Sequence, residues 1–139
     1  MIRAYVPADE DDLIRLWLAS TIPGQDFLPE PHWRAMEGEI RSLLPATETW
    51  VAEIDDEMVA FVSLLGDLIG GLFTHPDHQG RGHGSALVAH AAARHTPLFV
   101  EVFAANHRAL RFYRQRGFVD DERRVDPDSG LLQLIMRMG

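Results

Sequence analysis

A glycine-rich segment, Gln79-Gly80-Arg81-Gly82-His83-Gly84, separates an apolar run of strand type from an Ala-rich run of helix type. Glycines adopt backbone conformations that other residues avoid, so closely spaced glycines let main-chain N–H groups converge on one concave point. The helix that follows adds its unpaired N–H groups and the positive end of its dipole. This strand–loop–helix unit constrains the chain to a mixed α/β fold and favours a phosphate-binding loop.

The same glycines also fit a plain turn without a ligand. Counting from Gly80, Ser85 stands where a dinucleotide-binding loop has its third glycine, and no Gly-Lys-Ser or Gly-Lys-Thr sequence occurs. Because glycine has no Cβ, a phosphate could approach the backbone of this loop closely. Arg81, His78 and His83 would add positive charge beside it.

Short apolar runs alternate with amphipathic runs along the chain. Strands are expected at residues 2–6, 50–54, 58–65, 68–74, 98–103, 118–124 and 131–137. Helices are expected at residues 8–20, 31–44, 85–94 and 106–116, with a Pro/Gly loop at 21–31. Their order predicts one mixed α/β domain over residues 1–139.

Composition excludes several classes of protein. The 139 residues include 13 arginines, no lysine and 21 Asp or Glu, so the net charge is −8 and a nucleic-acid partner is not expected. Cysteine is absent, which excludes disulfides, thiolate metal sites and a Cys nucleophile. Residues 1–7 hold no apolar segment of signal-peptide type, and no apolar run approaches the ~20 residues of a membrane span. We therefore expect a cytoplasmic protein with no membrane partner.

The charge is unevenly distributed. Residues 1–66 hold four basic and thirteen acidic side chains, whereas residues 67–139 hold nine basic and eight acidic side chains. This asymmetry suits a cationic ligand on the first half and an anionic ligand on the second. The oligomeric state, monomer or homodimer, is left open.

The helix expected at 106–116 has Asn106, Ala109 and Tyr113 on one face, because their spacing is i, i+3, i+7. Phe112 and Leu110 supply an apolar stripe. Periodicity alone favours a half-buried tyrosine whose hydroxyl is hydrogen-bonded, with no catalytic role.

Two segments together carry a family resemblance. Gln79-x-x-Gly82-x-Gly84 and Asn106-x-x-Ala109-x-x-Phe112-Tyr113-x-x-x-Gly117-Phe118 resemble the signature segments of the GCN5-related N-acetyltransferases, and the resemblance covers essentially the whole chain. Phe27-Leu28-Pro29 and Leu43-Leu44-Pro45 look like features of a YjaB-like group of small bacterial members. The resemblance implies a mixed, mostly antiparallel twisted sheet with splayed central parallel strands and helices on both faces.

The resemblance also implies acetyl-CoA as cosubstrate and direct transfer of its acetyl group to a primary amine. Tyr113 would be the general acid that protonates the departing CoA thiolate. The remaining residues implied to bind the cofactor, through the pantetheine arm or the pyrophosphate, are Leu72, Phe73, Thr74, Gln79, Gly80, Arg81, Gly82, His83, Gly84, Ser85, Asn106 and Phe112. Within the strand before the loop, the Gly70-Gly71 pair is expected to form a bulge or to allow close backbone approach.

Transfer to an amine also requires a base, because a typical amine is protonated at pH 7. Glu101 lies in the otherwise apolar strand Phe99-Val100-Glu101-Val102, where a carboxyl could have a raised pKa that suits a base. Its spacing before Asn106 resembles that of the strand glutamate in ribosomal-protein acetyltransferases. Glu101 could equally face water or only bind a cationic acceptor, and Glu53 is a weaker candidate.

The acceptor itself is not identified by the sequence. It is expected to be a small-molecule or peptide amine, cationic in view of the charge asymmetry, in a pocket lined by Trp17, Phe27, Trp33 and Met36. The histidines and aspartate near the glycine loop, His75, Asp77, His78 and His83, are not expected to hold a metal. A CoA-binding sensor without turnover is the main alternative function, and a nucleotide-binding protein is disfavoured by the glycine spacing.

Overall fold

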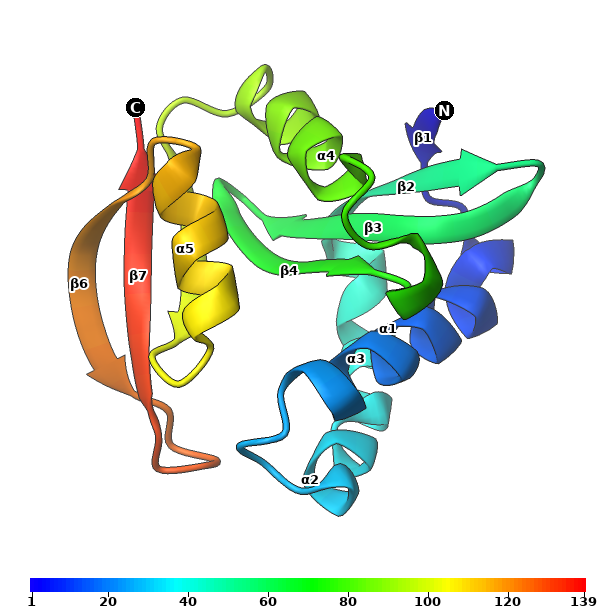
Figure 1. The fold of residues 1–139 in the computed structure, drawn as a ribbon. Helices are drawn as coiled ribbons and strands as arrows, with labels where there is room; N and C mark the ends of the chain where they lie inside the picture. The colour runs from blue at the N-terminus through cyan, green and yellow to red at the C-terminus, as the bar shows by residue number, and fades with distance from the viewer.

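A computed structural model describes residues 1–139 and contains one seven-stranded sheet (Figure 1). The strand order is β1-β2-β3-β4-β5-β7-β6, and every neighbouring pair is antiparallel except β4 and β5. The strands are β1 (Ile2–Ala4), β2 (Glu48–Ile54), β3 (Glu57–Leu65), β4 (Leu68–Thr74), β5 (Leu98–Phe103), β6 (Val119–Val125) and β7 (Leu132–Met138). The expected mixed, mostly antiparallel sheet is confirmed.

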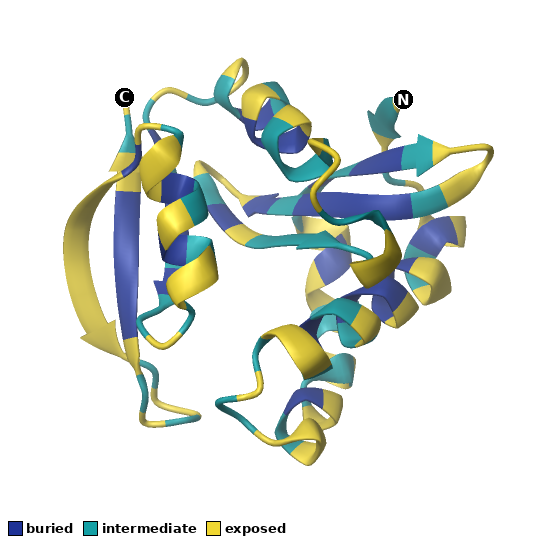
Figure 2. Ribbon diagram, in the orientation of Figure 1, coloured by how far each residue is buried: buried dark blue, intermediate teal, exposed yellow.

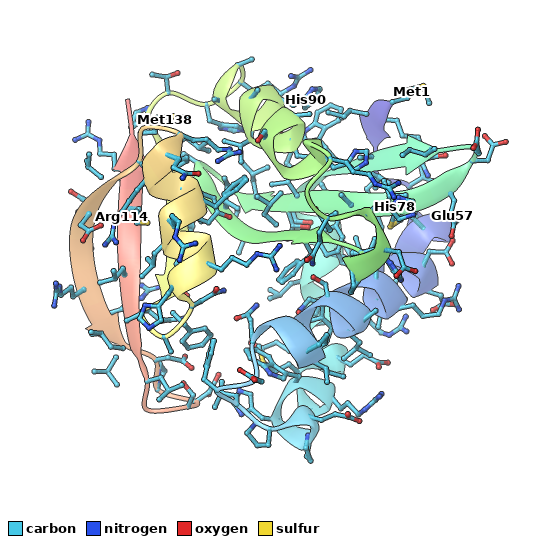
Figure 3. The ribbon with its side chains drawn as sticks, in the orientation of Figure 1. Met1, Glu57, His78, His90, Arg114 and Met138 are labelled. Carbon is cyan, nitrogen blue, oxygen red and sulfur yellow. The ribbon has the colours of Figure 1, made fainter.

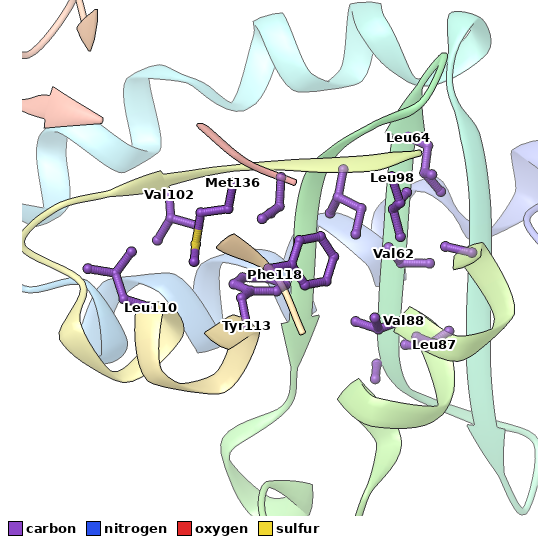
Figure 4. Close-up of a cluster of buried hydrophobic side chains, with 14 of the residues drawn as sticks. Val62, Leu64, Leu87, Val88, Leu98, Val102, Leu110, Tyr113, Phe118 and Met136 are labelled. Carbon is purple, nitrogen blue, oxygen red and sulfur yellow. The ribbon is translucent and has the colours of Figure 1, made fainter. Parts of the chain in front are cut away.

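Helices cover both faces of this sheet. The helices are α1 (Glu10–Gly24), α2 (Glu30–Ala35), α3 (Glu37–Leu43), α4 (His83–Ala92) and α5 (His107–Gln115), with short 3-10 turns at Pro7–Asp9, Leu44–Ala46 and Pro76–His78. On one face, α4 and α5 bury Leu87 and Leu110 against strand residues such as Val62 and Val102 (Figure 4). On the other face, the α1 and α2 residues pack against Val51 and Phe61. Helices on both faces are confirmed.

Alternation along the strands decides which side chains reach which core. In β5, Leu98, Val100 and Val102 are buried with α4 and α5, whereas Glu101 and Phe103 point to the opposite face. The last two strands of the sheet differ in exposure: the edge strand β6 is exposed along its length, and β7 beside it is mostly buried (Figure 2). The face that carries Glu101 is therefore the face toward α1 and α2.

The two parallel strands separate soon after they meet. β4 and β5 pair only at Leu68↔Phe99 and Ile69↔Val100, so their later residues have no partner on that side. The register between β3 and β4 shifts between Ser63 and Leu64, which leaves Gly70 as the extra residue of a bulge. A Cβ at Gly71 would lie 2.7 Å from the Phe73 ring. The glycine pair thus lies where the strands diverge, as the sequence predicted.

The N-terminal helices differ from expectation. The helix predicted for 8–20 continues to Gly24 with Pro23 in its last turn, because the buried Thr21 side chain holds this turn against the core. The helix predicted for 31–44 is two helices divided at Met36, and Leu44–Ala46 is a 3-10 turn. None of the helices has the length and apolar character needed to span a membrane.

Candidate functional site

Unpaired main-chain groups border the gap between β4 and β5. The His75 N–H donates to the Val59 carbonyl of β3. Main-chain groups alternate in direction along a strand, so Phe73 also faces β3 while Leu72 and Thr74 face the gap. Of the three residues expected to bond pantetheine through the main chain, only Leu72 and Thr74 are oriented for it, and Thr74 offers its N–H alone because its carbonyl accepts from the Gln79 side chain.

The glycine loop connects the end of β4 to the N-terminus of α4. Gly80 and Gly82 have positive φ values of +77° and +87°, and Gly82 immediately precedes the first turn of α4. The Gln79 side chain donates to the Thr74 carbonyl over 3.2 Å, which ties the loop to the strand end. Glycine is required at 80 and 82 for this left-handed backbone. The loop therefore presents a helix N-terminus beside the open edge of β4.

The loop carries less positive charge than expected. Burial, followed by the proximity of His78, lowers the pKa of His83, so this imidazole is neutral at pH 7. The Arg81 guanidinium is exposed and lies 3.5 Å from the His78 ring nitrogen Nδ1 (His78 is labelled in Figure 3). Arg81 is the permanent cation within the loop.

Gly84 has a different role from the other loop glycines. A Cβ there would lie 3.3 Å from Phe112 of α5, so this glycine allows α4 and α5 to approach each other. The Arg116 guanidinium stacks 3.6 Å from the Phe112 ring centroid and its Nε donates to the Ser85 hydroxyl over 2.9 Å. Phe112 and Ser85, both expected to bind the cofactor, are parts of this joint between the two helices.

A cavity of about 480 Å³ lies at the gap. It extends from β4 and β5 toward the N-terminal helices and the β6–β7 turn. Among the predicted site residues, its lining includes Leu72, Phe73, Glu101, Asn106 and Tyr113. Thr74, residues 79–85 and Phe112 lie outside the lining, on the α4 side. The structure therefore brings the two expected catalytic residues together in one cavity.

Tyr113 is almost completely buried in the core formed with α5, where Phe118 lies edge-on to its ring (Figure 4). Its hydroxyl has no hydrogen-bond partner within the protein, in contrast to the structural tyrosine that periodicity favours, and the residue lines the cavity. Burial raises the pKa of Tyr113 well above its usual value. The hydroxyl is therefore protonated at physiological pH and free to donate.

Asn106 caps α5. Its Oδ1 accepts a hydrogen bond from the Ala109 N–H over 3.2 Å, which satisfies one of the unpaired donors of the first turn. The amide group of the same side chain is left for another partner, and the residue lines the cavity. The predicted common face of Asn106, Ala109 and Tyr113 is confirmed, since all three line the cavity.

Glu101 is not in the apolar setting expected for it. Its carboxylate forms an ion pair with Arg124 of β6, and the Glu101 side chain is 23% exposed. The strand around Glu101 is apolar, but Arg124 reaches it across β7, a contact that strand composition could not reveal. Glu53, the weaker candidate base, pairs with Arg3 at the β1–β2 edge and does not line the cavity.

The remaining cavity wall is aromatic and acidic. Trp17, Trp33 and Met36 line it as expected, whereas Phe27 packs edge-on against Trp33, with ring centroids 6.4 Å apart. Its charged residues are Glu39, Glu101, Asp126, Asp128 and Arg124. Sequence reasoning missed all of these except Glu101, because they come from separate elements; only the acidic first half hinted at the charge. No group of three or more His, Asp or Glu side chains is placed to hold a metal ion.

Known proteins share this sequence pattern. Residues 45–120 match the family described as "Acetyltransferase (GNAT) domain". The chain is 33% identical over 120 residues to the peptidyl-lysine N-acetyltransferase YiaC of Escherichia coli, covering 85% of this chain and 82% of that protein. It is 35% identical over 118 residues to the peptidyl-lysine N-acetyltransferase YjaB of Escherichia coli, covering 84% and 80%.

Solved structures share the fold. The solution structure of apo-form YjaB from Escherichia coli matches with a TM-score of 0.88 and 31% identity, covering 99% of this chain and 95% of that one. The PaiA N-acetyltransferase of Thermoplasma acidophilum, in complex with coenzyme A, matches with a TM-score of 0.79 and 18% identity, covering 99% and 96%. Splayed strands, glycine loop and family match agree: the chain belongs to the GNAT acetyltransferases, a family of YjaB-like and related acyltransferases that use acetyl-CoA as acetyl donor.

Proposed function

We propose that the protein transfers the acetyl group of acetyl-CoA to the ε-amine of a lysine side chain, or to a primary amine of similar charge. The observation that carries the proposal is the single cavity that contains both Tyr113 and Glu101 beside the gap between β4 and β5. Four carboxylates and one arginine line this cavity, which suits a cationic acceptor. The names of the relatives YiaC and YjaB support lysine as the acceptor.

The chain offers groups suited to each part of the cofactor. Leu72 and Thr74 present main-chain groups to the gap, where the pantetheine arm would lie, and the Asn106 amide is available to the same arm. The N–H groups of Gly82 to Ser85 at the start of α4 would meet the pyrophosphate, with Arg81 beside them. The left-handed Gly80 and Gly82 let the chain turn into this helix start.

Acetyl-CoA supplies the acetyl group as an activated thioester. The acceptor ammonium loses one proton before its nitrogen attacks and a second as that nitrogen bonds to the thioester carbon, and Glu101 would accept each proton in turn and pass it to water. Tyr113 would donate its hydroxyl proton to the sulfur as the carbon–sulfur bond breaks. Its raised pKa means only that the hydroxyl is fully protonated before the reaction begins. Glu101 would thus pass two protons to water, while Tyr113 gives one proton to the sulfur and regains one from water, so that one proton is released per acetyl group transferred.

Substituting Tyr113 with Phe tests this assignment, because Tyr113→Phe keeps the ring packing and removes only the hydroxyl. A general acid contributes ~10²–10⁴-fold, and a CoA thiolate leaves fairly well unaided, so we expect kcat to fall by at least ~10-fold. Affinity for CoA should change little, since one hydrogen bond contributes ~0.5–1.5 kcal/mol. Tyr5→Phe is the matched control, because Tyr5 lies outside the cavity lining.

The readout is release of CoA together with acetyl-lysine formed on a lysine peptide. The chain contains no lysine, so acetyl-lysine cannot arise from acetylation of the enzyme itself. A kcat for Tyr113→Phe within a factor of two of wild type, with chemistry rate-limiting, would remove Tyr113 as the acid. Tight CoA binding without transfer to any amine would instead favour the sensor.

A further inference from the structure

The ion pair between Glu101 and Arg124 lies on the sheet face that lines the cavity. In the strand register, Phe103 of β5 lies opposite Gln133 of β7, and Gln133 lies opposite Arg124 of β6. Arg124 and Phe103 therefore share a face, and so does Glu101, two residues before Phe103. The Arg124 side chain extends diagonally over β7 to reach the Glu101 carboxylate. Both residues line the cavity that also contains Tyr113.

Arg124 is held weakly in this position. Its side chain is 50% exposed on the outermost strand, and its single charged partner is Glu101. Two arginines outside the cavity are held by more groups: Arg3 binds both Asp9 and Glu53, and Arg41 binds three carboxylates. An ion pair whose arginine is half exposed contributes little to stability, so little free energy is lost when Arg124 leaves Glu101.

A second place for the guanidinium lies close along the chain. Asp126 and Asp128 follow β6 directly and line the same cavity. Asp126 is engaged by the N–H and hydroxyl of Ser129, whereas Asp128 has no hydrogen-bond partner in the protein. The cavity wall therefore holds other carboxylates near Arg124 in the sequence, to which its guanidinium could move when it leaves Glu101.

We infer that Arg124 is a placeholder for the acceptor, whose ammonium group displaces its guanidinium from Glu101 when it enters the cavity. The inference rests on the proposed function, since Glu101 can take a proton from the acceptor nitrogen only after Arg124 has left. Arg124 is thus a specificity-determining residue. A cationic acceptor replaces one positive charge with another on Glu101, whereas an uncharged group that displaced Arg124 would leave the Glu101 carboxylate without a cationic partner.

The test compares Arg124→Gln with the wild-type protein, using Nα-acetyl-lysine amide as the acceptor. Removing the Arg124 guanidinium, which competes with the acceptor for Glu101, should lower the KM about two- to fivefold. This fold-change is the equivalent of the free energy that a half-exposed ion pair contributes. Arg123→Gln is the matched control, because Arg123 loses the same charge from β6 but lies opposite Leu134, on the other face. In a Glu101→Gln background, Arg124→Gln should give no further decrease.

Equilibrium binding of Nα-acetyl-lysine amide to the CoA-loaded protein, measured by calorimetry, provides a readout that does not depend on turnover. We expect the Kd to follow the same pattern as the KM. An Arg124→Gln variant with unchanged or higher KM and Kd would overturn the inference, as would an equal decrease in Arg123→Gln or in the Glu101→Gln background. If the binding pattern holds but no variant or wild-type protein acetylates an amine, the placeholder role stands and the proposed function fails.

Discussion

The two residues proposed for catalysis sit in opposite surroundings. Tyr113 is buried, has no hydrogen-bond partner and has a raised pKa, so its hydroxyl is fully protonated before the reaction. Glu101 is partly exposed and already paired with Arg124. In the proposed mechanism Tyr113, the acid, can donate its proton without any rearrangement. Glu101, the base, can accept a proton only after Arg124 has left it.

A residue-scale prediction concerns Asp9, which joins β1 to α1. Its carboxylate is buried, accepts two hydrogen bonds from the Arg3 guanidinium at 2.7 and 2.8 Å, and accepts a third from the Val6 N–H at 2.9 Å. The Arg3 hydrogen bonds hold the pKa of Asp9 below its usual value. We expect Asp9→Asn to lower the free energy of unfolding at pH 7 by ~1.5–3 kcal/mol, since these bonds involve a charged group.

The pH dependence follows from the direction of this shift. A lowered pKa in the folded state stabilises the protein above the unfolded value of ~3.9, and the contribution is lost as pH falls through the folded value. Urea unfolding should therefore show that the free energies of unfolding of Asp9→Asn and wild type differ less at pH 3 than at pH 7. Asp12→Asn, which alters an exposed carboxylate on α1, is the control. A difference that grows toward acid pH would contradict the assignment.

At the scale of elements, α5 contributes residues both to the cavity and to the contact with α4. Its N-cap Asn106 and its residue Tyr113 line the cavity, while Phe112 on the adjacent face meets α4 at Gly84. Arg116, just past its end, holds the Ser85 hydroxyl of α4. The position of α5 therefore sets both the proposed acid and the start of the helix that would bind the pyrophosphate.

A prediction at this scale separates the two roles of Asn106. Asn106→Ala removes the cap and should lower the free energy of unfolding by ~1 kcal/mol, whereas Asn106→Ser keeps an oxygen that can cap. Both variants lack the side-chain amide. If that amide binds the pantetheine arm, both should raise the Kd for CoA about two- to tenfold, the equivalent of one hydrogen bond.

Calorimetric titration with CoA and thermal unfolding together make this measurement. A Ser variant that binds CoA as tightly as wild type would show that Asn106 serves α5 alone. A Ser variant that unfolds like the Ala variant would show instead that the cap contact is not what stabilises the helix.

At the scale of the whole molecule, charge should guide the acceptor to the cavity. The net charge is −8, and the cavity lining brings Glu39 of the acidic first half together with Glu101, Asp126 and Asp128 of the second half. Attraction of this kind is screened over ~10 Å at 0.1 M salt and ~3 Å at 1 M. We expect kcat/KM for a lysine acceptor, at saturating acetyl-CoA, to fall several-fold over this range. An unchanged kcat/KM, or an anionic amine as the preferred acceptor, would refute the steering.

Local patterns in the sequence were sufficient to predict the strands, the glycine loop and α5. Their signals are short in range: period-two apolar runs, positive-φ glycines before a helix, and an Asn cap followed by i, i+3, i+7 spacing. Together with the family resemblance, they also identified Tyr113 and Asn106 as residues of one face. The predicted helix end before Pro23 was wrong because burial of Thr21 overrode local preference, and the division of the next helix at Met36 was not predicted.

Only the tertiary structure decided what surrounds those residues. Arg124 reaches Glu101 because β7 is inserted between β5 and β6, and Gly84 meets Phe112 because α4 and α5 lie on one face of the sheet. These contacts join segments about 20 to 30 residues apart through a strand order that periodicity does not encode. The sequence by itself therefore determined the elements, and its family resemblance pointed to the proposed acid. The pairing that governs the proposed base depends on strand register and exists only in the folded sheet.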